Sequence, residues 1–314
     1  MRRATLALAA ALALTAPGTS SGQESPEAMR CFGAASRDPE KRCVNRDLRF
    51  MVVPTPAEAR DGLNSPCEPI TKQGEEMYSC AFGTQWTEAS KTIALVGDSH
   101  AAHWRAALDV AAVHRGWHGL SLTESGCSLT KAIPVLKGRR RDDCVEYNRT
   151  LVRWLESHPQ VEIVFTSQHG GKVVTKRGQS QYDAQVDGFL RAFTELPPTV
   201  KQVVVIRDTP WSTRRAPGCV VAAAADRRRP DRACAIPRER ALRQDLAAVA
   251  VRKMRSRRVK LVNLTPFMCG PTSCFPVVGG ALVHKDGGHI TQLFSRTLGP
   301  YLGRALDRIL APAR

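Results

Sequence analysis

One serine stands where a short apolar run meets a helical pattern, a setting in which a hydroxyl can become a nucleophile. The run 93–96 ends at Gly97 and predicts a buried strand, and apolar residues at helical spacing begin at Ala101. Ser99 lies between them. It is therefore expected at a helix N-terminus, at the carboxyl edge of a parallel sheet, where backbone N–H groups favour a negative charge. Acyl transfer develops such a charge on the carbonyl oxygen.

A base for this serine is offered near the other end of the chain by Lys285-Asp286-Gly287-Gly288-His289. A serine hydroxyl needs a neighbouring base before it can attack a carbonyl. One tight turn can carry both Asp286 and His289, so that the carboxylate orients the imidazole. The chain order Ser, Asp, His occurs in triads of unrelated folds. Asp208 is an alternative orienting carboxylate, and we prefer Asp286 for its proximity to His289.

Together these motifs resemble the SGNH hydrolases. The resemblance is carried by Gly97-Asp98-Ser99-His100, by Ser125-Gly126-Cys127 after the second expected strand, and by Asp286-x-x-His289. It covers roughly residues 31–311 and is closest to SGNH domains attached to membrane acyltransferases that O-acylate bacterial surface polysaccharides. The family implies a flavodoxin-like, three-layer α/β/α sandwich. It also implies a Ser99–Asp286–His289 triad, with the backbone N–H groups of Ser99 and Gly126 as oxyanion donors.

The third oxyanion donor is where the sequence departs from the family. Relatives outside the membrane-acyltransferase branch carry Gly-x-Asn-Asp after the third strand, whereas this chain has Ser167-Gln168-His169-Gly170-Gly171. Gln168 or Ser167 would have to donate from its side chain, or two backbone donors would serve. Losing one donor costs about 100- to 1000-fold in rate. The departure therefore argues against high hydrolytic activity.

Several side chains beside these motifs have two possible roles. Asp98 is expected to bond to backbone near Ser99. His100, and His103 one turn further on, either pack beneath the turn or line the substrate cleft. The stretch Arg207-Asp208-Thr209-Pro210-Trp211 resembles a family Asp-Thr-Pro-Trp motif. Trp211 there is either a platform for a sugar ring or an aromatic residue at the edge of the core.

Apolar periodicity predicts an α/β domain over residues 91–314. Strands are expected at 93–96, 119–123, 161–166, 202–208 and 259–264. Helices are expected at 101–115, 145–157, 183–195, 238–254 and 290–310. The alternation indicates a five-stranded parallel sheet. Residues 127–144, 209–237 and 266–280 are expected to be loops.

The region before this domain has a different composition. Met1-Arg2-Arg3, an apolar run and then small residues indicate a secretory signal peptide over 1–22. No later run approaches about 18 apolar residues, so no transmembrane helix is expected in the mature chain. Residues 23–90 contain four of the cysteines and several prolines. They predict an irregular extension wrapped over the main domain.

Ten cysteines in an exported chain indicate disulfides. We prefer pairing between sequence neighbours, although spacing alone leaves the connectivity open. The pairs are Cys31 with Cys43, Cys67 with Cys80, Cys127 with Cys144, Cys219 with Cys234, and Cys269 with Cys274. No Cys-x-x-Cys pair is present, and the Cys269/Cys274 spacing has no matching second pair, so a zinc site is not expected. No cofactor is expected either.

The formal charge of +17 includes basic runs at 139–141, 227–229 and 252–258. Because export separates the protein from nucleic acid and these runs lack aromatic residues, we do not expect a nucleic-acid partner. An anionic cell-envelope polymer or a membrane surface fits better. Solvated loops and helix faces explain the same runs.

The hypothesis is an exported, envelope-associated serine esterase or O-acyltransferase that works through an acyl-enzyme. By resemblance, its substrate is an acetyl-sized ester of a cell-envelope glycan. Two alternatives remain open. One is a non-catalytic glycan-binding module on the same scaffold, and the other is an accessory partner of a separate membrane acyltransferase.

Overall fold

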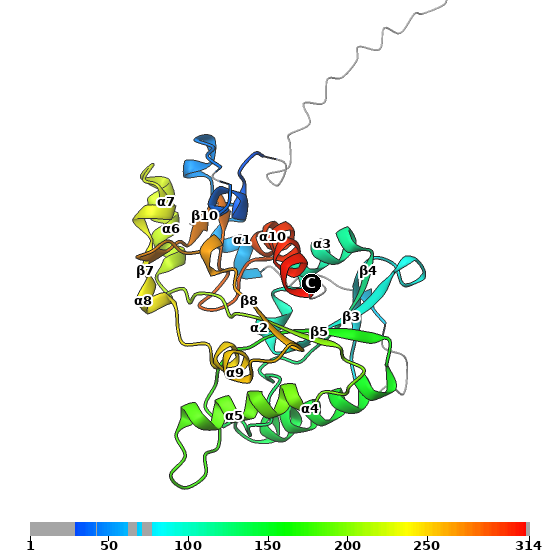
Figure 1. The fold of residues 1–314 in the computed structure, drawn as a ribbon. Coiled ribbons are helices and arrows are strands. Elements are labelled where there is room, and N and C mark those ends of the chain that lie inside the picture. Colours follow the sequence, from blue (N-terminus) through cyan, green and yellow to red (C-terminus); the bar gives the residue numbers. More distant parts are fainter. Residues whose placement is uncertain (1–28, 42, 62–67, 71–76, 312–314) are drawn as a thin grey trace, which may run out of the picture.

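The computed structural model describes residues 29–41, 43–61, 68–70 and 77–311 of the 314-residue chain. The expected signal peptide over 1–22 lies outside these residues. At the centre is a seven-stranded sheet in the order β1-β2-β4-β3-β5-β6-β8 (Figure 1). Its strands are β1 Glu68–Pro69, β2 Cys80–Gly83, β3 Lys91–Gly97, β4 Trp117–Thr123, β5 Val161–Ser167, β6 Gln202–Ile206 and β8 Val259–Val262.

The five expected strands are present and parallel, in the order β4-β3-β5-β6-β8. This order is typical of doubly wound sheets, and β3 lies at the point where the strand order reverses. The expectation of only five strands is wrong. The extension adds β2, antiparallel to β4, and β1, antiparallel to β2. These two strands are so short that their sequence carries no alternation to detect.

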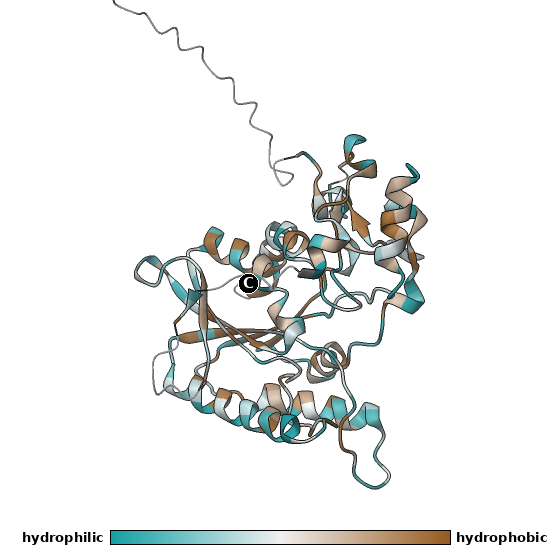
Figure 2. Ribbon diagram, turned by 180° about the vertical axis from the view of Figure 1, so that it is seen from behind, coloured by the Kyte–Doolittle hydropathy of each residue, from teal (hydrophilic) through white to brown (hydrophobic). Residues whose placement is uncertain are grey.

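Helices cover both faces of the sheet (Figure 1). One face is covered by α4 Arg139–Ser157, α5 Gln181–Thr194 and α9 Leu246–Met254, and the other by α3 Arg105–Arg115 and α10 Gln292–Leu310. Ile93 and Leu95 pack with α3 and α10, whereas Ala94 and Val96 pack with the opposite helices. Alternate residues of β3 therefore fill two separate cores, as the period of a strand requires. Figure 2 shows apolar colour along the central strands and mixed colour on the helices.

A side lobe forms from the expected loops 209–237 and 266–280, from part of the N-terminal extension and from the start of the helix expected over 238–254. It contains α1 Pro56–Asp61, α6 Ala216–Ala225, α7 Pro230–Ala233, β7 Ile236–Pro237, α8 Arg238–Ala241, β9 Ser273–Cys274, β10 Val277–Val278 and β11 Ala281–Leu282. Short 3-10 helices are η2 Gly33–Arg37, η3 Asp47–Phe50, η4 Trp86–Glu88 and η5 Thr265–Phe267. The helix expected over 238–254 is broken. Asp245 accepts a hydrogen bond from the N–H of Ala248 and begins α9 anew.

The N-terminal extension is fastened to the last helix. Asp38 accepts two hydrogen bonds from Arg304, at 2.6 and 3.0 Å, and the N–H of Ala34 donates to the Thr297 hydroxyl. Phe32 and Leu48 lie in the same core as α10. In its described part the extension thus shares the core of the main domain.

Four of the expected disulfides are present: Cys31–Cys43, Cys127–Cys144, Cys219–Cys234 and Cys269–Cys274. The fifth expected pair involves Cys67, which lies outside the described residues, and Cys80 is disulfide-bonded. Among the described residues, no helix combines the length and the apolarity that a membrane span requires.

Candidate active site

Ser99 is the first residue of α2 Ser99–Ala102, which follows β3 directly. The turn between strand and helix depends on Gly97, whose φ is +120°. A Cβ there would lie 3.0 Å from the Thr166 hydroxyl and 3.1 Å from the Ser167 carbonyl. Glycine therefore lets the backbone turn sharply beside β5 and present Ser99 at the edge of the sheet.

Asp98 joins the loops that follow three neighbouring strands. Its side chain is buried and accepts hydrogen bonds from the N–H of His100 at 2.8 Å, the hydroxyl of Ser128 at 2.7 Å and the N–H of His169 at 2.8 Å. The first bond is the one expected from the sequence. The other two connect the β3 turn to the loops after β4 and β5, so this carboxylate fixes the surroundings of Ser99.

The structure brings Ser99, His289 and Asp286 together. The Nε2 atom of His289 lies 2.8 Å from the Ser99 Oγ, and its Nδ1 atom lies 2.7 Å from the Asp286 Oδ2. The other oxygen of Asp286 accepts the N–H groups of Gly288 and His289, each at 2.8 Å. The tight turn therefore holds the carboxylate by its own backbone and directs it at the imidazole.

These bonds set the charge of Asp286. Burial alone would raise the pKa of its carboxyl, but the hydrogen bonds from the His289 ring and from the Gly288 and His289 N–H groups outweigh burial and lower that pKa strongly. Asp286 is accordingly an anion throughout the neutral range. An anion here favours the His289 tautomer that carries its proton on Nδ1 and leaves Nε2 as an acceptor facing Ser99.

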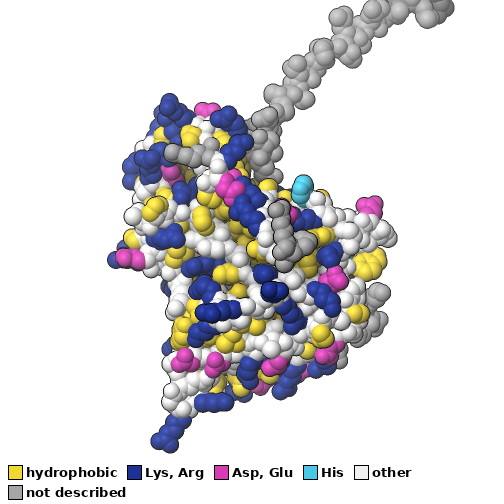
Figure 3. All heavy atoms as spheres, viewed as in Figure 1, with side chains coloured by type: hydrophobic (Ala, Val, Ile, Leu, Met, Phe, Trp, Pro, Cys, Tyr) yellow, Lys and Arg dark blue, Asp and Glu magenta, His cyan; other side chains and the backbone are white. Residues whose placement is uncertain are grey.

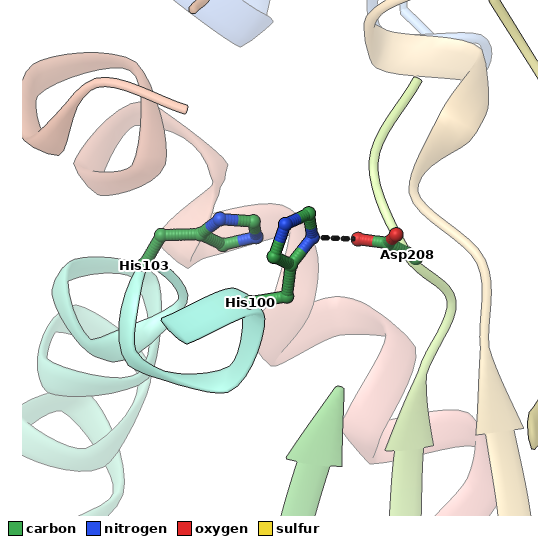
Figure 4. Close-up of side chains that lie close together, drawn as sticks. All are labelled: His100, His103 and Asp208. Carbon is green, nitrogen blue, oxygen red and sulfur yellow. Dashed lines mark hydrogen bonds and ion pairs between the residues drawn. The ribbon is translucent and has the colours of Figure 1, made fainter. Parts of the chain in front are cut away.

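A second aspartate–histidine pair lies beside the first. Figure 4 shows His100 between His103 and Asp208, with its Nδ1 atom 2.7 Å from the Asp208 Oδ1. Burial would lower the pKa of His100, but the hydrogen bond and charge of Asp208, with smaller effects of Asp98 and Asp286, raise it. Asp208, the alternative orienting carboxylate, is thus bonded to His100.

Donor atoms of His100, His103 and Asp208 lie within 4.8 Å of one another, which invites a metal interpretation. Two ligands of one tetrahedral zinc ion, with bonds near 2.0 Å, would stand roughly 3.3 Å apart. The 2.7 Å between His100 and Asp208 is instead a hydrogen-bond distance. We therefore interpret the cluster as a hydrogen-bonded pair with a buried imidazole behind it.

The remaining histidines of the site are held neutral by burial. Burial, reinforced by the charges of neighbouring histidines, lowers the pKa of His103 far below its ordinary value, and neither ring nitrogen has a partner among the described residues. Burial also lowers the pKa of His169, and it lowers that of His284 to about 4. A protonated imidazole is thus disfavoured at these three positions.

The loop after β6 holds the Asp286–His289 turn in place. The Thr209 hydroxyl donates to the Gly288 carbonyl at 3.1 Å, the Ser212 N–H donates to the Gly287 carbonyl at 2.9 Å, and His284 Nε2 lies 2.6 Å from the Pro210 carbonyl. A Cβ on Gly288 would lie 3.1 Å from the His100 ring. The pair of His100 and Asp208 is therefore packed directly against this turn.

Gly126 has a φ of +78° and lines the same cavity as Asp98 and His169. This cavity has a volume of about 510 Å³. The Gln168 carboxamide is buried, its oxygen accepting the Leu129 N–H at 2.9 Å and its nitrogen donating to the Thr166 hydroxyl at 2.7 Å. Both ends are thus engaged inside the protein, which favours a scaffolding role over oxyanion donation.

Trp211 lies near the site but is partly covered. The Arg243 guanidinium lies 3.8 Å from its ring centroid, and the His169 ring centroid is 5.0 Å away. A sugar ring stacking on the Arg243 face would have to displace this guanidinium.

Comparisons with known proteins identify the family of the chain. Residues 66–304 match the model of the SGNH domain that is fused to AT3 domains. The periplasmic domain of the lipopolysaccharide acetyltransferase of Salmonella ser. Paratyphi A is similar in structure, with a TM-score of 0.54 at 15% identity over 73% of this chain and 91% of that one. A soluble variant of monoglyceride lipase from Saccharomyces cerevisiae has a TM-score of only 0.30 at 7% identity, over 79% of this chain and 96% of that one.

No curated protein sequence matches the chain. The likeness to the acetyltransferase domain is one of fold, because the identity is low. The family model, by contrast, covers most of the sequence, including Ser99, Asp286 and His289. The chain therefore belongs to the SGNH domain family of the type fused to AT3 acyltransferase domains.

Proposed function

We propose that this protein is a serine esterase or O-acyltransferase that moves an acyl group, of acetyl size, on a cell-envelope glycan. One observation carries the proposal: His289 lies in hydrogen-bond contact with Ser99 at 2.8 Å on one nitrogen and with Asp286 at 2.7 Å on the other. A nucleophile, a base and an orienting carboxylate in this arrangement form the constellation that serine acyl transfer requires.

In the proposed first step, the Ser99 Oγ attacks the ester carbonyl carbon while its proton passes to His289 Nε2. The Asp286 carboxylate stabilises the imidazolium that forms and remains ionised itself. The tetrahedral intermediate then expels the alcohol, which takes the proton from His289, and leaves the acyl group on Ser99. Water or a sugar hydroxyl next gives a proton to His289 and attacks the acyl-enzyme. This second step regenerates Ser99 and releases an acid or a new ester.

The oxyanion of each tetrahedral intermediate is assigned to the backbone N–H groups of Ser99 and Gly126. Ser99 begins a helix, and its N–H is among those with no intrahelical partner. Gly126 has the left-handed backbone conformation that permits close approach to a ligand. We assign Gln168 the task of holding Leu129 and Thr166. With two donors in place of three, the proposal includes slow hydrolysis.

The cavity of about 510 Å³ is the proposed place for the glycan. Its lining includes Gly126, His169 and Asp98, the residue that precedes Ser99 in the chain. Its volume falls in the range of small-ligand sites. The fold likeness to the periplasmic domain of a lipopolysaccharide acetyltransferase supports an acetyl group and an envelope glycan as the substrate class.

The test is cleavage of a small chromogenic acetate by the wild type and by Ser99→Ala. We expect cleavage by the wild type, slow in water and faster when an acceptor sugar is added, and none by the variant. Labelling with a serine-directed fluorophosphonate should mark the wild type alone. Equal cleavage by a folded Ser99→Ala variant would refute the proposal, and absence of labelling in the wild type would favour a glycan-binding module.

A further inference from the structure

A second cavity lies in the side lobe and shares no lining residue with the cavity beside Ser99. It has a volume of about 340 Å³. Its walls come from η2, η3, α7 and the β10–β11 hairpin, and four arginines stand among the lining residues: Arg37, Arg46, Arg49 and Arg229. Figure 3 shows Lys and Arg side chains gathered over this lobe.

The positive charge of this cavity is poorly compensated. Asp231 is the one acidic residue that lines it, and Arg229 already binds its two oxygens at 3.2 and 2.7 Å. Within the described part of the chain, the guanidinium groups of Arg37, Arg46 and Arg49 have no carboxylate partner. The cavity therefore carries about three uncompensated positive charges.

Arg37 is the most unusual of the four arginines. Its guanidinium carbon lies 4.3 Å from the centroid of the Phe275 ring, and its Nε atom is buried without a hydrogen-bond partner among the described residues. Burial lowers the pKa of Arg37, with only the charge of Asp231 acting against it. A half-buried guanidinium with an unsatisfied N–H costs free energy that a bound anion would offset.

The backbone segments that line the cavity around Arg37 are held by covalent and hydrogen bonds. The Cys31–Cys43 disulfide closes one wall, and the neighbouring Asp38 is bonded to Arg304. The floor is the Gly279–Gly280 turn, where the Gly279 carbonyl accepts the N–H of Gly33 at 2.9 Å. The cavity is thus largely formed before any ligand arrives, which reduces the entropy cost of binding.

We infer that this arginine-lined cavity binds a phosphate group. A guanidinium presents a planar set of donors that matches phosphate oxygens. A phosphate monoester carries close to two negative charges at neutral pH, so it suits three uncompensated arginines better than a single carboxylate would. The group can come from a phosphorylated glycan or from a lipid whose headgroup is a phosphate monoester, such as phosphatidic acid. This inference does not depend on the proposed ester chemistry.

The test follows amide shifts of Gly279 and Gly280 in the ¹⁵N-labelled protein during titration with inorganic phosphate, at constant ionic strength. Arg37→Gln should bind at least about tenfold more weakly, as expected for the loss of a charge-assisted hydrogen bond. Asp231→Asn should bind more tightly. Arg177→Gln, which removes an exposed arginine from another loop, should bind as the wild type does. Acetate, a monoanion, should shift the same amides only at higher concentration.

The double variant Arg46→Gln/Arg49→Gln serves as a second test if Arg37→Gln fails to fold. Its two side chains are exposed, so we expect it to fold normally. It too should bind phosphate more weakly. A hexose phosphate and vesicles containing phosphatidic acid, both phosphate monoesters, then identify the source, since Arg37→Gln should lose binding to whichever carries the natural group. Two results would each overturn the inference: phosphate that leaves Gly279 and Gly280 unshifted in the wild type, or equal affinity in the wild type and the arginine variants.

Discussion

The two aspartate–histidine pairs of the site have the same contact distance and opposite surroundings. Each pair joins an Nδ1 atom to a carboxylate oxygen over 2.7 Å, and the rings of His100 and His289 lie 4.8 Å apart. The side chains of His289 and Asp286 are 27% and 49% exposed, whereas those of His100 and Asp208 are 4% and 13% exposed. Of the two imidazole rings, only that of His289 also lies within hydrogen-bond distance of the Ser99 hydroxyl. The aspartate–histidine bond is therefore common to both pairs. What distinguishes the candidate catalytic pair from the structural one is its solvent exposure and its contact with the Ser99 hydroxyl.

The largest effect should come from the exposed pair. We expect His289→Ala to lower kcat/KM for a chromogenic acetate by about 10⁴-fold or more, and Asp286→Asn by about 10²- to 10⁴-fold, because the base and its orienting carboxylate act as a unit. Thermal unfolding should barely change, since both side chains are partly exposed. Steady-state kinetics on the purified variants provides the measurement. A folded His289→Ala protein with wild-type activity would remove the contrast between the pairs.

The next effect should come from the buried pair and appear mainly in stability. Asp208→Asn should lower the free energy of unfolding by about 1–3 kcal/mol, because it weakens a buried charge-assisted hydrogen bond. Its kcat/KM should fall far less than that of His289→Ala. Urea denaturation compares the variant with Glu156→Gln, a substitution at an exposed residue of α4. Were Asp208→Asn as stable as Glu156→Gln, the buried pair would have no structural role.

The contact between the pairs can be tested at adjacent glycines. Gly288→Ala should cost about 1–2 kcal/mol of stability and also reduce kcat, because its Cβ would lie 3.1 Å from the His100 ring and push the Asp286 turn aside. Gly287→Ala is the matched control, since its Cβ would meet only atoms 4.0 Å away. If both variants behave alike, the packing of His100 against the turn does not position His289.

The smallest effect concerns pH. The pKa of His100 is raised in the folded protein, so the stability it gains from Asp208 is fully present below its unfolded pKa of about 6.5 and is lost as pH rises through the folded pKa. The difference in unfolding free energy between wild type and Asp208→Asn should therefore be larger at about pH 6 than at about pH 9. Denaturation at both values measures this difference, and a pH-independent difference would show that His100 stays neutral.

Local patterns made part of this molecule predictable. Each of the five parallel strands contains a short stretch rich in apolar residues, and Asp286 and His289 share one turn, so neither needed tertiary information. The break before α9 had a signal, because Asp245 stands just before an apolar stretch and Asp is a favoured N-cap. Asp208 follows β6 at the edge where Ser99 follows β3. Because both residues lie at the same edge of the sheet, the sequence could have predicted that Asp208 lies near His100.

Other features depend on contacts that sequence does not record. The role expected of Gln168 followed from its chemical likeness to asparagine, whereas its bond to Leu129 arises only when the loops after β4 and β5 meet. β2 is only 4 residues long, and its pairing with β4 joins two segments that are distant in the chain. The sequence did not single out Arg37, because the burial of its guanidinium and the unsatisfied Nε atom arise only in the folded side lobe.

Ser99 and His289 are separated by 190 residues in the chain, so the ribosome adds them at different times. A ribosome adding about 5–20 residues per second needs roughly 10–40 s to pass from one to the other. During that interval the nascent chain carries its serine without a base. The proposed ester chemistry at Ser99 can therefore begin only after the final segment of the chain has emerged and docked. A product that stops before Asp286 is expected to be inactive.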